Sequence, residues 1–405
     1  MRLGDHPFKR KADFCFLLFF ILLSISPLMH APHNNYTAFN NGALDIVSGR
    51  DPYPQDWQTS ENFRNWFMYS PSFGVFFMPF SKSGLGLHMG TLAWYLLNLF
   101  AFWYGFKGVV RHLDPTGLFS RWWHFLALLL CANEMMGSLT NLQSNAFIGG
   151  LMMAGMAAYF EKRYVVSALL LALGTNFKIY PVVAALLMAM ELNAAFLLSF
   201  AVFFSLILLA PAPLVGMDFL FSLLAHWLGI FMSDPLHPVF LGLEPTLAHF
   251  GLHPGIPQFL AFISINALAI AIVAFAVFQR ERSQFIRLLA PLALAFILLF
   301  NKRTESPTFV LLVPALAFIL HEALYERHNG DDALFRAHLA VMVAAWFLIS
   351  LAHSDLFPKM VRHIADEWRF KTFGALLVYC WAWVQAVQFF FGTRRDAIVV
   401  PLEPA

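Results

Sequence analysis

Charged residues are scarce in this sequence. They make up 12% of its 405 residues, about half of the 25% that is typical of soluble domains. So little charge cannot coat a soluble globule of this length. The 26 basic and 24 acidic residues leave a net charge of only +2. Because a nucleic-acid-binding protein carries a clustered basic face, we expect no nucleic-acid partner.

Cysteine is almost absent as well. Cys15, Cys131 and Cys380 lie far apart, each inside an apolar run, so we expect free thiols buried as small hydrophobic side chains. No spacing of metal-binding residues indicates a metal site, and we expect none.

Apolar residues are abundant instead. They make up 59% of the chain, which holds 46 phenylalanines and has a mean hydropathy of +0.65. Since a spanning helix needs roughly 20 apolar residues, the sequence predicts an all-α polytopic membrane protein with about twelve transmembrane helices. The apolar segments are 14–29, 66–81, 87–106, 120–137, 145–160, 164–177, 179–191, 194–211, 258–278, 285–301, 307–321, 335–351 and 372–392. With no internal repeat, we interpret residues 1–405 as a single transmembrane domain.

Basic residues predict the topology. Lys9, Arg10 and Lys11 precede the first apolar segment and place the N-terminus in the cytoplasm. No clear cleavage site follows that segment, so we expect it to stay as a helix in the cell (inner) membrane. The later basic loops, and the stretch from Lys107 to Arg121, fit the cytoplasmic side if 66–81 does not cross. Two long loops, 31–65 and 211–257, then fall on the outer face; the second carries an amphipathic stretch at Leu220–Met232.

The first outer loop holds the acids Asp45 and Asp51, the latter in a Gly-Arg-Asp-Pro-Tyr turn that ends at Tyr53. Such a turn has an ordinary structural explanation, with Asp-Pro initiating it and the tyrosine in the interfacial aromatic belt. Its acids are equally compatible with solvated loop residues or with chemistry.

Amides and a lysine interrupt the apolar segments further on. Asn141, Gln143 and Asn145 lie between two segments, where they either cap the helices or hydrogen-bond sugar hydroxyls. Lys178 interrupts an apolar stretch, at a cost of about 2.5–3.5 kcal/mol if it sat at a helix centre. It either reaches the interface with its ammonium group or binds a phosphate.

A fourth polar segment carries Lys302, Arg303 and Glu305 between two apolar segments. Cations on the outer face run against the positive-inside tendency, and an anionic substrate would explain them. Glu305 beside Arg303 is also explained by a simple ion pair.

These segments, in this order, resemble glycosyltransferase family 87, the membrane mannosyltransferase-like group with the GT-C fold. The resemblance covers roughly residues 14–320. Its motifs are Gly-x-Asp-x-Tyr, Tyr-x-Pro, Leu-x-x-x-Gln-x-Asn and Gly-x-x-x-Lys-x-x-Pro. They are matched by Gly49, Asp51 and Tyr53; by Tyr69 and Pro71; by Leu139, Gln143 and Asn145; and by Gly174, Lys178 and Pro181.

Two departures mark a divergent branch of that family. The family usually places an acid at the start of the first outer loop, where this chain has Asn35. It often has histidines near the fourth segment, where this chain has Glu305-Ser306-Pro307-Thr308. The acid has either moved, with Glu305 as the first candidate, or the activity is lost.

The resemblance implies transfer of a hexose, mannose-like, from a polyprenyl-phosphate sugar to a lipid-linked or cell-surface glycan acceptor at the outer face. No Asp-x-Asp nucleotide-sugar motif is present, and we expect no cofactor beyond the lipid donor itself. The expected general base is Glu305, Asp51 or Asp45. The donor phosphate is expected to be bound by Lys178, Arg303 and Lys302. The sugar or the acceptor is expected to be bound by Asn35, Tyr53, Gln143 and Asn145. We also expect Asp51, Gln143, Lys178 and Glu305 to line one cavity.

Two other functions use the same residues. A transporter or flippase for a lipid or small solute would place intramembrane polar groups along a pathway without chemistry. A non-catalytic membrane scaffold would account for the missing acid at Asn35.

Overall fold

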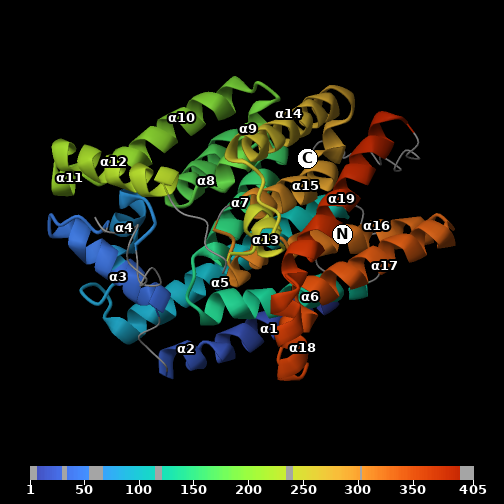
Figure 1. Ribbon diagram of the computed structural model, residues 1–405, viewed down its shortest axis with the longest axis horizontal. Coiled ribbons are helices and arrows are strands. Elements are labelled where there is room, and N and C mark those ends of the chain that lie inside the picture. The colour runs from blue at the N-terminus through green and yellow to red at the C-terminus, as the bar shows by residue number, and fades with distance from the viewer. Residues whose placement is uncertain are drawn as a thin grey trace. The chain divides into compact units, whose positions relative to one another are not determined.

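A computed structural model describes residues 7–29, 34–53, 67–114, 121–233, 240–301 and 303–392. Every regular element in these ranges is a helix, which confirms the expected all-α fold (Figure 1). The chain divides into two compact units, and the boundary falls inside three of the helices. Unit 1 comprises residues 1–14, 110–133 and 241–405, and unit 2 comprises 15–109 and 134–240. The interpretation of the chain as a single domain stays a prediction.

Unit 2 contains the helices of the first half of the chain. They are α1 (Pro7–Leu23), α2 (Ile25–Met29), α3 (Asn34–Val47), α4 (Pro71–Phe77), η3 (Met78–Phe80), α5 (Leu87–Leu113), α6 (Arg121–Thr140), α7 (Asn145–Phe160), α8 (Tyr164–Phe177), α9 (Pro181–Ala189), α10 (Ala194–Leu209), α11 (Ala212–Val215) and α12 (Met217–Ser233), with α1, α5 and α6 shared with unit 1.

Helix α7 is the core of unit 2, because every side chain from Asn145 to Tyr159 is buried. Helix α8 packs against α7 and also against α10, as the green helices of Figure 1 show. Gly150 of α7 meets the backbone of Ala101 on α5. Small residues at such a crossing let two membrane helices approach closely, so the core of unit 2 is packed tightly around α7.

Unit 1 is built around α15. Its helices are α13 (Leu243–His249), α14 (Ile256–Arg280), η4 (Arg282–Gln284), α15 (Phe285–Phe300), η5 (Ser306–Leu311), α16 (Pro314–His328), α17 (Asp332–Ile349), η6 (Leu351–His353), α18 (Lys359–Glu367) and α19 (Phe370–Phe390). Helix α15 is almost wholly buried. It packs against α19, which packs against α17, and α17 against α16.

Many helices present apolar side chains on their outer surface. Along α10, Leu198, Val202 and Leu206 lie one turn apart and are 69%, 56% and 61% exposed. Water would penalise such a row, whereas lipid does not. Among the described residues, six helices are long and apolar enough to cross a membrane: Lys11–Met29, Ala194–Val215, Ile256–Arg280, Arg282–Phe300, Asp332–His353 and Phe370–Phe390. The chain is therefore a polytopic membrane protein, while the total of about twelve spans stays a prediction.

Several helix bounds follow the sequence closely. Helices α7 and α8 begin and end where the apolar segments 145–160 and 164–177 do. The amphipathic stretch at Leu220–Met232 lies within α12. The segment expected not to cross, 66–81, contains a short apolar helix at Pro71–Phe80. Ten helical residues extend only about 15 Å, half of the hydrocarbon thickness.

Both long loops contain helices. Helix α3 lies within the first loop, 31–65, and buries Tyr36, Phe39, Ala43 and Ile46. These residues recur with helical spacing, and the asparagines between them conceal the pattern. The second loop holds α11, α12 and α13. Helix α5 continues to Leu113, through part of the expected cytoplasmic connection.

The cysteine expectation is correct only in part. Cys131 is buried, but Cys15 and Cys380 are exposed. Both exposed thiols lie on candidate spans, where an apolar side chain faces lipid as readily as protein.

Candidate functional site

Lys178 lies at a break between two helices. Helix α8 ends at Phe177, and Pro181 is the first residue of α9. Between them Lys178 is extended, with φ −151° and ψ 130°. Gly174 makes the bend possible, since a Cβ there would lie 2.8 Å from Cγ of Pro181. In the Gly-x-x-x-Lys-x-x-Pro motif, the glycine and the proline pack closely against each other, and the lysine therefore lies between the two helices.

Three neutral groups contact the ammonium group of Lys178. Its Nζ donates to Oδ1 of Asn145 at 2.8 Å. It also lies 5.3 Å from the ring centre of Tyr69 and 5.1 Å from that of Tyr180. Amide oxygens and aromatic faces attract a cation without neutralising it. These three neighbours help to hold the ammonium group in position at the helix break.

The amide segment forms the junction of α6 and α7. Leu142 has the left-handed conformation, with φ 52°, which costs a residue with a side chain about 1–2 kcal/mol. The carbonyl of Leu142 accepts from Nε1 of Trp94 at 3.0 Å. Asn145 donates its Nδ2 to Oε1 of Gln143. Asn141 bonds back to the carbonyl of Gly137 at 2.7 Å, as a helix-terminating amide does, whereas Asn145 contacts the lysine.

The Gly-x-Asp-Pro-Tyr turn follows α3. Gly49 has φ +71°, and the amide of Arg50 donates to the carbonyl of Asp45 at 2.8 Å, which closes the helix C-terminus. Oδ1 of Asp51 then accepts from the amide of Tyr53 at 2.9 Å. This is the Asx turn that an aspartate before proline favours.

Tyr53 connects this turn to the Lys178 region. Its side chain is 3% exposed, and its hydroxyl donates to the carbonyl of Tyr69 at 2.8 Å. Burial raises the pKa of the Tyr53 phenol well above its ordinary value, and the charge of Asp51 raises it further. Tyr53 is therefore a protonated donor under physiological conditions. Ser144 in turn donates to the hydroxyl of Tyr69 at 2.8 Å.

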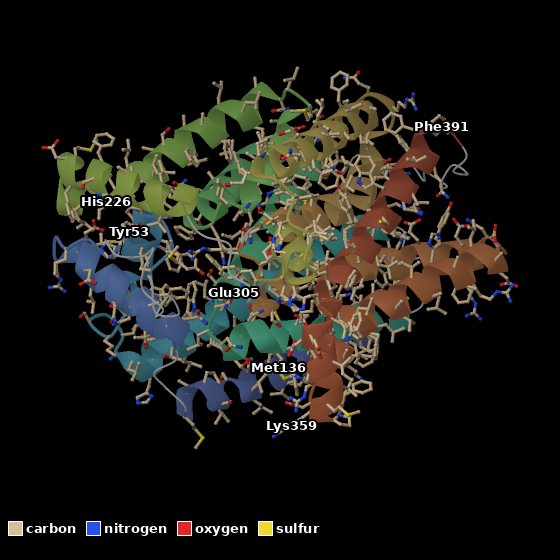
Figure 2. The ribbon with its side chains drawn as sticks, viewed as in Figure 1. Tyr53, Met136, His226, Glu305, Lys359 and Phe391 are labelled. Carbon is tan, nitrogen blue, oxygen red and sulfur yellow. The ribbon has the colours of Figure 1, made fainter. Side chains whose placement is uncertain are left out.

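Further polar residues of the first loop and of α12 have defined partners. Arg50 binds Asp45, with Nε 2.8 Å from Oδ1. Asn35 donates its Nδ2 to the carbonyl of Asn141 at 2.9 Å. Oδ2 of Asp51 contacts Nδ1 of His226, which lies on α12. Figure 2 labels His226 itself and Tyr53, which is two residues beyond Asp51 in the chain.

Unit 2 thus joins most of the residues proposed from its sequence. Contacts run from Asp51 through Tyr53 and Tyr69 to Lys178 and Asn145, and Gln143 follows. Asn35 reaches the same junction through Asn141, while Asp45 is paired at the end of α3.

Sequence reasoning missed three participants in this cluster. Tyr69 was only a motif member without a role, and Tyr180 is the near neighbour of Lys178. His226 had no signal beyond its place in an amphipathic stretch.

The fourth polar segment belongs to unit 1. Thr304 is buried there and donates to the carbonyl of Leu298 at 2.7 Å, and its own carbonyl accepts from the amide of Leu241 at 2.6 Å. Glu305 follows this anchor directly before η5 and is exposed; it is labelled in Figure 2. Arg303 is half-buried, and Lys302 lies outside the described residues. That both units contribute to one cavity stays a prediction.

The fold is that of an all-α polytopic membrane protein. It holds a polar site in which a lysine at a helix break contacts an amide and two tyrosines. Glycosyltransferase family 87 matches residues 67–301, more than half of the chain. The chain belongs to this family and is a membrane glycosyltransferase. No curated protein matches it.

The matched region includes Tyr69, Gln143, Asn145, Lys178 and His226. Family membership favours the transferase over the transporter and the scaffold. Within the described part of the chain, no three His, Cys, Asp or Glu side chains gather closely enough to hold a metal ion.

Proposed function

We propose that this glycosyltransferase transfers a mannose-like hexose from a polyprenyl-phosphate sugar to a lipid-linked or cell-surface glycan. The reaction takes place on the extracytoplasmic side of the cell membrane, with the N-terminus in the cytoplasm. The lipid donor enters from the bilayer, so the chain needs no nucleotide-sugar site and no cofactor. The observation that carries this proposal is the position of Lys178, a cation at a helix break that contacts the amide of Asn145 and the rings of Tyr69 and Tyr180.

Donor recognition centres on phosphate. When the bond from C1 of the sugar to the phosphate oxygen breaks, negative charge develops on the departing polyprenyl phosphate. A preorganised cation at that place stabilises the transition state more than the ground state. Lys178 is assigned this role in unit 2, whereas the phosphate contacts expected from Arg303 and Lys302 rest on the sequence alone.

Sugar and acceptor hydroxyls are assigned to the neutral polar groups. Gln143 and Asn145 present an amide pair beside Lys178. Tyr53 and Asn35 flank the same junction through their contacts with Tyr69 and Asn141. Amides and phenols supply both donors and acceptors, which is what a hydroxyl-rich ligand requires.

Removal of the proton from the acceptor is assigned to a carboxylate at the outer face. The acceptor hydroxyl must lose its proton as its oxygen attacks C1, which calls for a base within hydrogen-bond reach. Glu305 and Asp51 are the carboxylates proposed for this step. Asp45 is the third candidate, and its ion pair with Arg50 makes it the weakest of the three.

The test is a donor comparison in membranes. Membranes that contain the wild-type chain are incubated with radiolabelled polyprenyl-phosphate mannose, with polyprenyl-phosphate glucose, or with the corresponding nucleotide sugars, and the lipid products are separated. Label from a lipid donor should enter a new product only when the chain is present. Transfer from a nucleotide sugar, with no transfer from either lipid donor under conditions that block synthesis of lipid donors, would refute the proposal.

A further inference from the structure

The sequence resemblance implies an acid at the position of Asn35, and the amide that stands there has a structural role. The Nδ2 group of Asn35 donates to the carbonyl of Asn141 at 2.9 Å. A carboxylate cannot donate this bond, so the departure is tied to the way the α6–α7 junction is held. If the chain transfers sugars, the proton must leave the acceptor through a different group.

An aspartate and a histidine meet elsewhere in unit 2. Gly49 ends α3 with φ +71°, and the Asx turn that follows uses Oδ1 of Asp51 for the amide of Tyr53. The turn therefore fixes the carboxylate with its other oxygen, Oδ2, directed at Nδ1 of His226. The two residues are 175 positions apart in the chain.

Helix α12 presents the histidine at the edge of its buried face. Leu220, Leu223 and Ile230 are buried at helical spacing. Trp227 anchors the same face by donating its Nε1 to the carbonyl of Met68 at 3.2 Å. His226 precedes this anchor, so its ring direction is determined by the packing of α12 and by the carboxylate of Asp51.

The contact selects the tautomer of the imidazole ring. A carboxylate accepts a hydrogen bond from Nδ1–H, so in the neutral ring the lone pair lies on Nε2. The His226 side chain is 45% exposed and that of Asp51 23%. No described residue hydrogen-bonds Nε2 of His226. An oriented, accessible Nε2 with a carboxylate behind it is the arrangement that enzymes use for general-base catalysis.

The pair is also connected to the proposed phosphate site. Asp51 binds the amide of Tyr53, whose hydroxyl binds the carbonyl of Tyr69. The ring of Tyr69 lies beside the ammonium group of Lys178. The histidine and the cation thus belong to one set of contacts within unit 2.

We infer that His226 is the general base of the transfer reaction and that Asp51 is its positioning residue. Nε2 takes the proton from the acceptor hydroxyl while the oxygen forms its bond to C1 of the sugar. The bond from C1 to the phosphate oxygen breaks, and its electron pair leaves with the polyprenyl phosphate. The imidazolium then releases its proton to water. This inference rests on the proposed function and replaces a direct role of the Asp51 carboxylate.

The experiment uses the full-length chain in liposomes with polyprenyl-phosphate [14C]mannose and [14C]glucose and a membrane lipid extract as acceptor source. His226→Asn should lower kcat by ~10²–10⁴-fold with little change in the KM for the donor. Asp51→Asn should lower kcat as well. His88→Asn is the matched control, because His88 is an exposed histidine of the same unit and should keep the wild-type rate.

Imidazole rescue separates proton transfer from a structural role. Free imidazole should raise the rate of His226→Gly in a concentration-dependent way and leave His88→Gly unchanged. A folded His226→Gly chain that imidazole does not activate would overturn the inference. So would His226→Asn with more than about a tenth of the wild-type kcat, and a 100-fold loss in Glu305→Gln alongside it would assign the base to Glu305. A wild-type chain inactive with both donors would instead refute the proposed function itself.

Discussion

Lys178 donates a hydrogen bond of 2.8 Å from Nζ to Oδ1 of Asn145. This bond joins the break between α8 and α9 to the first residue of α7, the most buried helix of unit 2. A rigid helix therefore determines where the cation lies. Positions determined in this way are what electrostatic stabilisation of a departing phosphate requires.

Replacement of Lys178 should impair donor use. Lys178→Met keeps the length of the side chain and removes the charge, so KM for the lipid donor should rise ~10- to 100-fold, the loss of one charge-assisted contact. Lys178→Arg should retain part of the affinity. The measurement is the initial rate against donor concentration at matched expression, with Lys82→Met, an exposed lysine of the same unit, as control. An unchanged KM in Lys178→Met would show that Lys178 does not bind the donor and only extends its ammonium group to the membrane interface.

Restoration of the family's acid should destabilise this chain. Asn35→Asp replaces the donor to the carbonyl of Asn141 with a carboxylate, and an unsatisfied group of this kind costs about 1–3 kcal/mol. Asn41→Asp is the matched control, because Asn41 only accepts a bond from Asn40 and a carboxylate also accepts. Thermal unfolding in detergent should show a lower Tm for Asn35→Asp alone. Equal Tm values for the two variants would contradict the structural role given to the amide.

Gly174 should not tolerate a side chain. An added Cβ would lie 2.8 Å from Cγ of Pro181, so Gly174→Ala should displace the break that carries Lys178 and lower both Tm and transfer rate. Gly137→Ala provides the contrast, because a Cβ there meets nothing within 4 Å. Alanine in a helix is favoured over glycine by about 1 kcal/mol, so this control should be neutral or stabilising. Similar losses in both variants would rule out the packing explanation.

Tyr53→Phe should remove one buried hydrogen bond and so lower the stability of the fold. The hydroxyl of Tyr53 donates to the carbonyl of Tyr69, and its loss should cost about 1 kcal/mol of unfolding free energy. Because burial raises the pKa of this phenol above the ordinary 10.0, its stabilising effect is present below pH 10.0 and decreases as the pH rises above that value. Unfolding of the wild type and of Tyr53→Phe, compared at neutral and alkaline pH, measures the effect. A difference that grows above pH 10.0 would contradict it.

Part of the fold follows from the sequence alone. The bounds of α7 and α8 are predictable because polar residues interrupt otherwise continuous apolar runs on both sides. The bounds of helix α3 are not predictable, because asparagines separate its buried aromatic residues and its mean hydropathy is low. Helix α5 extends past Lys107, whose Nζ lies 4.7 Å from the ring of Trp103. This local cation–π contact stabilises a charged side chain within the helix, at a point where the charge alone predicts that the helix ends.

The candidate site shows the same limit. Lys178 and Asn145 are recognisable one by one, because a lysine and an amide are costly in lipid. Their hydrogen bond depends on the packing of α7 against α8 and α9 and cannot be inferred from spacing. The contact of Asp51 with His226 joins the turn after α3 to helix α12, and no sequence period relates these two segments. An isolated histidine in an amphipathic stretch looks like any interfacial residue until its partner is known.

The most direct test of the account counts both products of the reaction. The purified chain in liposomes receives a polyprenyl-phosphate [14C]hexose as its sole donor, with a membrane lipid extract as acceptor. Sugar transferred to the acceptor and polyprenyl phosphate released are measured together. One polyprenyl phosphate should be released for each sugar transferred, and both quantities should fall in parallel in Lys178→Met. Sugar transfer to the acceptor without matching release of polyprenyl phosphate would contradict the proposed function.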